Sequence, residues 1–179
     1  LADLGSWFAI PKARILLLTP KARDFFRPGV RDGRRIVVRC LERNGNLIGE
    51  PSAVMFRHAA ARTGFDPQYR QMVDLEFFLR LLEKGDFCYL PQKLAAFRRH
   101  SDQETAKNNR NGVEVGEHVL LTQTWLAKPW VGSRRHTRRE MQFNLIRSCR
   151  KTNTAESLAL KVELMFRLGR GWYVVYWLK

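Results

Sequence analysis

The chain has 179 residues, is 45% hydrophobic and carries a formal net charge of +15. A chain of this size is expected to form one domain with a sizeable core. It holds no run of about 18 apolar residues, so no membrane-spanning helix is expected. The three cysteines are widely spaced and odd in number, which fits neither a metal cage nor a disulfide framework. These features predict a cytoplasmic protein.

The positive charge is unevenly distributed. Residues 1–50 carry 10 basic and 5 acidic side chains, residues 51–105 carry 8 and 7, and residues 106–179 carry 14 and 5. The central stretch is nearly neutral, and the excess lies on both sides of it. A basic surface attracts polyanions such as nucleic acid or anionic lipid headgroups. An ordinary solvated, Arg-rich surface is an equal alternative.

The first 45 residues give a mixed signal. Two short apolar runs, each ended by a proline, precede residue 21 and fit either strands or one irregular helix. Residues 23–35 are turn-rich and typical of a loop over a site. Residues 36–41 resume an apolar pattern that predicts a short helix ending near Asn44-Gly45. A tight segment of small residues follows, and Val54–Phe56 is short enough for a buried strand.

Residues 73–84 carry the clearest helical pattern. Four apolar residues share one helical face: Leu75, Phe78, Leu79 and Leu82. Glu76 and Arg80 are four residues apart and are expected on the polar side. Gly85 is the residue at which we expect a left-handed stop. Asp74 lies in the first turn, where unpaired amides and the helix dipole favour a carboxylate.

Two short strands are predicted after this helix. Phe87–Leu90 ends at a proline, and Leu94–Phe97 delivers Arg98 and His100 to its end. Three separate elements would then supply the acid Asp74, the small-residue loop at 49–52 and His100. Functional sites are commonly built in this way, from residues on several elements of a rigid fold.

The last third of the chain is predicted to be helical after a polar linker at 101–112. One helix covers residues 115–126, and Ser133 is a candidate cap for a second helix with an arginine-rich first turn. A third helix is expected from Asn153 to Gly169. The aromatic tail that follows fits either packing on the domain or the interface of an anionic membrane.

Three segments in order resemble parts of family 2 glycosyltransferases, which have the GT-A fold. NLIGEPSAV, from Asn46, resembles the family's glycine-containing loop beside the donor and acceptor sites. GFDPQYRQMVDLEFFLRLLEKGD resembles the region where a general-base Asp lies six residues before an Arg, and Asp74 and Arg80 have that separation. LAAFRRHSDQET resembles the segment with a late histidine that often helps to hold the metal. The likeness covers roughly residues 25–104, and Val73 stands where the family usually has an acidic residue.

The resemblance implies an α/β fold. Residues 1–105 would form a partial GT-A-like (nucleotide-diphospho-sugar transferase) domain, and residues 106–179 a basic helical C-terminal extension. The family's nucleotide-binding half and its Asp-x-Asp motif precede this region, and the chain contains no Asp-x-Asp. The resemblance thus implies a C-terminal part whose N-terminal nucleotide-binding half is missing, and which is weak or inactive alone.

The implied activity is hexosyl transfer from a nucleotide sugar to a hydroxyl of a glycan or another acceptor. Asp74 would be the general base that takes the hydroxyl proton. The substrate-binding residues would be Gly49, Glu50, Pro51, Ser52 and Arg98. His100 would hold a divalent metal, Mg or Mn, that bears charge on the departing diphosphate.

Other functions remain open. Asp74 could be only a helix cap, His100 a structural residue, and Arg98 a solvated charge. The basic flanks could instead make the chain a binding module for nucleic acid or a peripheral protein of the inner membrane face. Nucleic acid is the less favoured of these partners, because the sequence has no recognisable RNA-binding motif. A non-catalytic remnant is a third alternative.

Overall fold

The computed structural model describes residues 28–92, residue 94 and residues 113–150. The expectations for Arg98, His100, the linker, the third helix and the aromatic tail lie outside these residues. Among the helices in the described ranges, none combines the length and the apolar character needed to cross a bilayer.

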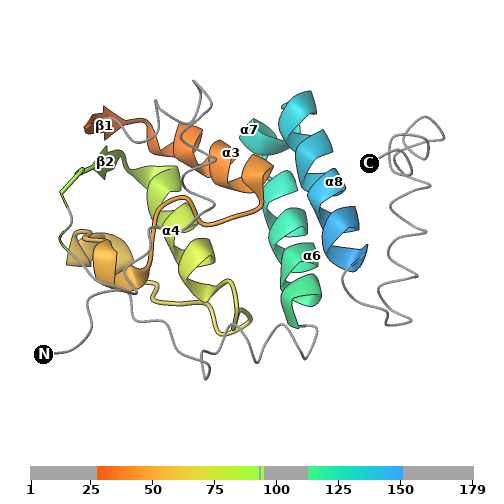
Figure 1. Ribbon diagram of the computed structural model, residues 1–179, viewed down its shortest axis with the longest axis horizontal. Coiled ribbons are helices and arrows are strands. Elements are labelled where there is room, and N and C mark those ends of the chain that lie inside the picture. Colours follow the sequence, from red (N-terminus) through yellow and green to blue (C-terminus); the bar gives the residue numbers. More distant parts are fainter. Residues whose placement is uncertain (1–27, 93, 95–112, 151–179) are drawn as a thin grey trace, which may run out of the picture.

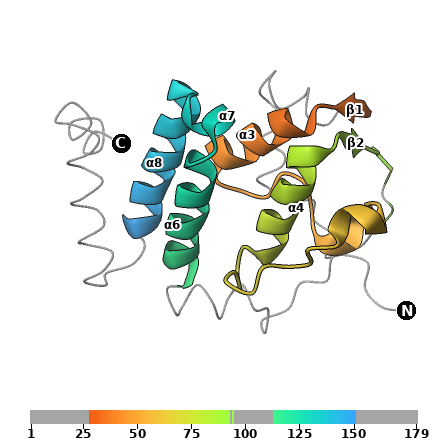
Figure 2. The ribbon, with the colours of Figure 1, turned by 180° about the vertical axis from the view of Figure 1, so that it is seen from behind.

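Helices dominate the described structure (Figure 1). α3 (Gly33–Arg43) packs against both α4 (Val73–Lys84) and α8 (Arg135–Arg150). α6 (Val113–Leu126) packs against α8, and the short α7 (Pro129–Gly132) contacts both of them. The view from behind shows the same order, with α6 and α8 at one end of the molecule (Figure 2).

A two-stranded antiparallel ribbon lies at the other end. β1 (Gly29–Arg31) pairs with β2 (Phe87–Tyr89), so that Val30 lies opposite Cys88. The strand at 87–90 was predicted and is confirmed, whereas β1 falls within the segment predicted as a loop. Side chains alternate between the faces of a ribbon, and Val30 and Cys88 are both exposed. The fold is thus mixed, mainly helical with one small sheet, which agrees with the α/β expectation only at this coarse level.

One hydrophobic core joins the helices. Its buried members come from α3, α4 and the segment before it, α6, α7 and α8: Ile36, Val37, Cys40, Leu41, Tyr69, Met72, Leu75, Leu79, Leu82, Leu121, Trp125, Val131 and Met141. Cys40 is almost fully buried, and this burial raises the pKa of its thiol to about 12. Because residues on both sides of position 105 contribute, the helices after the linker complete the core of the preceding part.

α3 has clear start and stop signals. The Asp32 carboxylate accepts a hydrogen bond of 2.7 Å from the backbone N–H of Arg35, as an N-cap does. Asn44 has φ of 50° and closes the helix in the left-handed conformation. The predicted end near Asn44 is confirmed, and the helix begins three residues before the predicted start at Ile36.

The predicted strand at Val54–Phe56 is wrong. This segment is irregular and lies between two 3-10 helices, Pro51–Ala53 and His58–Ala61. Met55 is 97% exposed. Phe56 reaches the α4 ring of Phe77 at 5.3 Å between centroids. The apolar run therefore supplies one aromatic contact and is not a buried strand.

Two expectations about α4 are also corrected. Gly85 ends the helix in an extended conformation, with φ of −143°, and not in the left-handed one. The predicted pairing of Glu76 with Arg80 is confirmed, but Glu76 is buried and not on an exposed polar side. Its partner Arg80 clamps the segment at residues 63–64 over this side of the helix, so the pair lies beneath a loop.

The first turn of α3 and the last turn of α4 come into close contact through two glycines. A Cβ atom on Gly33 would overlap the backbone carbonyl oxygens of Leu82 and Gly85. Backbone atoms cannot move aside as a side chain can. The crossing of α3 and α4 therefore requires glycine at position 33.

We predict that Gly33→Ala destabilises the fold by at least about 2 kcal/mol, because the added methyl group overpacks this crossing. Gly116→Ala in α6 is the matched control, because a Cβ atom at position 116 would have no contact within 4 Å. It should gain about 1 kcal/mol from helix propensity. Urea denaturation of both variants measures the difference, and equal stabilities would contradict the close crossing.

Candidate functional site

Asn46 organises the loop that was predicted to line a site. Its Oδ1 accepts hydrogen bonds from the backbone N–H groups of Ile48, at 2.9 Å, and Gly49, at 3.1 Å. Its Nδ2 donates to the Gly49 carbonyl oxygen at 2.8 Å. Gly49 has φ of +130°, a conformation that favours glycine. One side chain thus fixes the loop that leads into Glu50, Pro51 and Ser52.

The same amide links this loop to the start of α4. Asn46 Nδ2 also donates to Asp74 Oδ2 at 3.1 Å. Asp74 Oδ1 accepts from the backbone N–H of Leu75 at 2.7 Å. An ionised carboxylate has about four lone-pair positions, and these two bonds leave acceptor capacity for another donor. Asp74 is half-buried, so part of the residue is in contact with solvent.

The carboxyl group of Glu50 is close enough to that of Asp74 for the two to interact electrostatically. Partial burial and, secondarily, the Asp74 carboxylate raise the pKa of the Glu50 carboxyl group. Two neighbouring carboxylates disfavour simultaneous ionisation. The loop and the entrance of α4 therefore form one acidic site, with Asp74 fixed by hydrogen bonds and Glu50 on the exposed side.

A buried carboxylate on α6 accepts hydrogen bonds from the backbone at the start of α4. Glu117 is 5% exposed and accepts hydrogen bonds from three successive backbone N–H groups, those of Arg70, Gln71 and Met72, at 2.6 to 3.1 Å. The N-cap residue of α4, Met72, makes no side-chain cap. Glu117 therefore supplies the negative charge and the acceptors that this helix end lacks in its own sequence.

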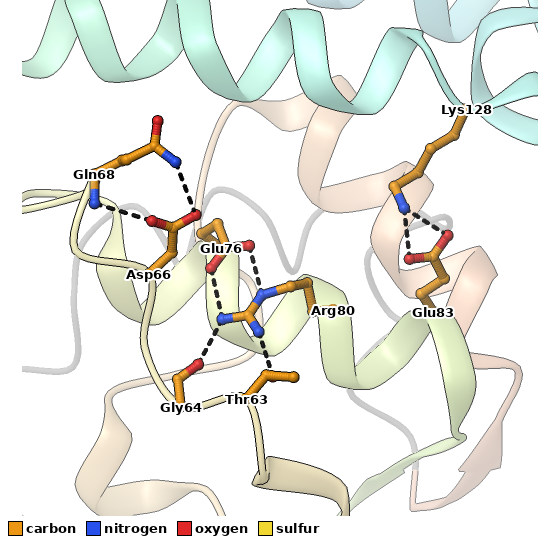
Figure 3. Close-up of polar contacts among 8 residues, drawn as sticks. All are labelled: Thr63, Gly64, Asp66, Gln68, Glu76, Arg80, Glu83 and Lys128. Atoms are coloured by element: carbon orange, nitrogen blue, oxygen red, sulfur yellow. Dashed lines mark hydrogen bonds and ion pairs between the residues drawn. The ribbon is translucent and has the colours of Figure 1, made fainter.

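Arg80 forms hydrogen bonds to the loop at residues 63–64 (Figure 3). Its guanidinium group forms two hydrogen bonds with Glu76, at 2.6 and 3.0 Å, and reaches Thr63 Oγ1 and the Gly64 carbonyl oxygen at 2.6 and 2.7 Å. The Asp74–Arg80 separation singled out in the sequence thus joins two residues with different contacts. Asp74 contacts the Asn46 loop, and Arg80 clamps the other side of α4.

A second ion pair fixes the far end of α4 (Figure 3). Lys128 Nζ lies 2.8 Å from Glu83 Oε2, and Trp130 Nε1 donates to Glu83 Oε1 at 3.1 Å. Burial opposes ionisation of Glu83, but these hydrogen bonds outweigh it and lower the pKa of its carboxyl group. α4 is therefore tied at both ends to the helices that follow the linker.

The structure brings some of the predicted site residues together. Asp74, Gly49 and Glu50 lie at one location, and Pro51 and Ser52 continue from them as a 3-10 helix. The two remaining predicted site residues, Arg98 and His100, lie outside the described residues. Five of the seven predicted site residues are thus described, and Gly49, Glu50 and Asp74 lie close together among them.

Two residues of the site were missed by sequence reasoning. Asn46 carries a recognisable signal, because an Asn two residues after a left-handed helix end commonly bonds to the backbone ahead of it. Glu117 carries none, because it lies 45 residues after Met72 in the sequence. Only the docking of α6 on α4 reveals its role.

The described residues do not by themselves make a metal site. Within the described ranges, no group of three or more His, Cys, Asp or Glu side chains is placed to hold a metal ion. Glu50 and Asp74 are hard oxygen donors of the kind that Mg²⁺ accepts, but Mg²⁺ normally needs further ligands. The expected divalent metal stays a prediction that depends on His100.

Comparisons with known proteins add one relative. The chain is 38% identical over 85 residues to an uncharacterized protein of Mycobacterium tuberculosis. The match covers 45% of this chain and 26% of the relative, so the chain spans about a quarter of the length of the curated protein it matches. No family model matches the chain. No solved structure matches it either.

We predict that Glu117→Gln destabilises the protein by about 2 kcal/mol, because charge-assisted hydrogen bonds to three N–H groups are replaced by those of a neutral amide. Glu140→Gln, on a partly exposed position of α8, is the matched control and should change stability by less than about 0.5 kcal/mol. Chemical denaturation measures both. A Glu117→Gln variant as stable as the control would contradict the cap.

We also predict that Asp74→Asn lowers the pKa of Glu50 while leaving it above its ordinary value, because partial burial is the larger cause of the shift. The folded state holds the Glu50 proton more tightly than the unfolded state. The resulting stabilisation is present at low pH and is lost as the pH rises through the folded-state pKa. NMR titration of the Glu50 side chain measures the effect, with exposed Asp86→Asn as the control that should leave it unchanged.

Proposed function

We propose that the chain is the acceptor-side part of a family 2-like glycosyltransferase with a GT-A-like fold, and that Asp74 is its general base. The reaction is transfer of a hexosyl group from a nucleotide sugar to an acceptor hydroxyl. The observation that carries this proposal is the Asn46 bridge, which fixes the Asp74 carboxylate against the Gly49–Ser52 loop.

The chemistry asks for a base that removes the hydroxyl proton as the oxygen attacks the anomeric carbon. Asp74 meets three conditions for this role. Its orientation is set by the hydrogen bonds from Asn46 and Leu75, it keeps acceptor capacity, and it is partly accessible. Glu50 beside it is placed to accept a hydrogen bond from another hydroxyl group of the acceptor.

Donor binding is the part of the proposal that depends on residues elsewhere. In the resemblance, the diphosphate is held by the nucleotide-binding half and by a metal. Arg98 and His100 are the candidates in this chain for the diphosphate and the Mg or Mn ion. When bound, such a metal would carry negative charge of the departing diphosphate. The acceptor-side residues do not depend on it for their arrangement.

The test is transfer from a panel of nucleotide sugars by wild type and Asp74→Asn, measured on the chain and on the chain extended by its upstream reading frame. Loss of a general base should lower the rate about a hundredfold to ten-thousandfold. Asp86→Asn removes the same charge at an exposed position and should leave the rate unchanged. Equal rates for wild type and Asp74→Asn would remove Asp74 as the base.

The upstream reading frame separates this function from a non-catalytic remnant. An in-frame Asp-x-Asp there would favour sugar transfer, and stop codons would favour the remnant. A binding function of basic residues is compatible with either result, because it does not involve Asp74 or the Asn46 loop.

A further inference from the structure

Five arginines lie where the C-terminal half of α3 meets the first turns of α8, and we call them the arginine surface: Arg39, Arg43, Arg135, Arg138 and Arg139. Arg43, Arg135, Arg138 and Arg139 are exposed, and Arg39 is partly exposed. Figures 1 and 2 show α3 and α8 as neighbouring helices, and the two pack against each other.

The contact between the two helices is made by Glu42. Thr137 Oγ1 donates to Glu42 Oε1 at 2.7 Å, and Asn144 Nδ2 donates to the Glu42 carbonyl oxygen at 2.9 Å. His136 Nδ1 lies 3.4 Å from the same carboxylate oxygen. Glu42 is therefore already bonded to α8, and these bonds fix the two arginine-bearing segments against each other.

Three of these arginines have no acidic partner among the residues that the structure describes. Within the part of the chain that the structure describes, Arg43, Arg135 and Arg138 form no ion pair with a carboxylate. Arg135 and Arg138 also lie in the first turn of α8, where the helix dipole is positive and basic residues are unfavourable. Their clustering there costs stability in the isolated protein, and an external anion would offset that cost.

We propose that the arginine surface docks on an anionic lipid bilayer, with these guanidinium groups against the phosphate and carboxylate of the headgroups. The exposed arginines belong to two helices that pack against each other, and their positive charge complements a layer of anionic headgroups. Each arginine close to an anionic membrane strengthens binding about fivefold. This proposal does not rest on sugar transfer, because it involves neither Asp74 nor the Asn46 loop.

A bilayer fits the surface better than single-stranded nucleic acid does. Binding of single strands relies on exposed aromatic rings on which bases stack. Among the described aromatic residues near this surface, Trp125 is buried, and the rings of Trp130 and Phe143 are covered by Arg34 and Arg147. The sequence also places tryptophans and tyrosines in the last nine residues, at 172, 173, 176 and 177, and these residue types favour the membrane interface.

The experiment is co-sedimentation of the whole chain with vesicles of phosphatidylcholine, with and without phosphatidylserine. Wild type should bind the phosphatidylserine vesicles at low salt and be released at high salt. The variant Arg43→Gln/Arg135→Gln/Arg138→Gln should bind roughly a hundredfold more weakly, and Arg135→Gln alone about fivefold more weakly. Arg135→Gln removes positive charge from the start of α8 only, so this single variant should not have a lower melting temperature than wild type.

The matched control is Arg57→Gln/Arg62→Gln/Arg70→Gln, which removes the same charge from exposed positions outside the arginine surface. It should retain most of the binding. Equal loss in the two triple variants would overturn the proposal in favour of net charge alone, and so would failure of wild type to bind. Tighter binding of wild type to single-stranded poly(U), with the same dependence on the three arginines, would assign the surface to nucleic acid instead.

Discussion

The buried carboxylate of Glu117 is the contact on which the rest of the arrangement depends. It accepts hydrogen bonds from the backbone N–H groups of Arg70, Gln71 and Met72 and so determines where α4 begins. Asp74 lies in the first turn of α4, and the Asn46 loop is hydrogen-bonded to Asp74. A displacement of α6 would therefore reach the candidate site through the backbone of α4, although Glu117 itself is not among the residues that surround the Asp74 carboxylate.

The two ends of α4 show the same construction. At its start the partner is Glu117 of α6, and at its end Glu83 is bonded to Lys128 and Trp130. The core likewise takes residues from helices before and after position 105. The helical segment after the linker thus supports the candidate site directly. This explains how a segment with so small a sheet can hold a loop and a helix entrance in fixed positions.

Local sequence signals predicted the elements that local forces determine. α4 was predicted at its observed bounds, because a strong apolar period runs from Val73 to the stop at Gly85. The end of α3 at Asn44 follows from the left-handed preference of Asn. The errors arose where tertiary contacts override these signals. Gly85 is extended where α3 crosses α4, and Glu76 is buried where the loop at residues 63–64 covers its partner Arg80. Met55 is a different case, because it is exposed although its neighbours in the sequence are apolar.

The candidate site divides in the same way. The pairing of Asp74 with the loop that follows Asn46 was predicted from the family resemblance, and the structure links Asp74 to Asn46 and Glu50 of that loop. The Glu117 cap could not be predicted, because its partners are 45 to 47 residues away and no local pattern marks them. The arginine surface could be predicted only as a charge imbalance, since its location depends on how α3 and α8 pack.

The bonds between Glu42 and α8 have a consequence for biosynthesis. Thr137 and Asn144 follow Glu42 by 95 and 102 residues. At elongation rates of about 5 to 20 residues per second, Glu42 is synthesised roughly 5 to 20 seconds before these partners. During that interval α3 can pack on α4 but not on α8, so the α3–α8 contact forms only after α8 has been synthesised.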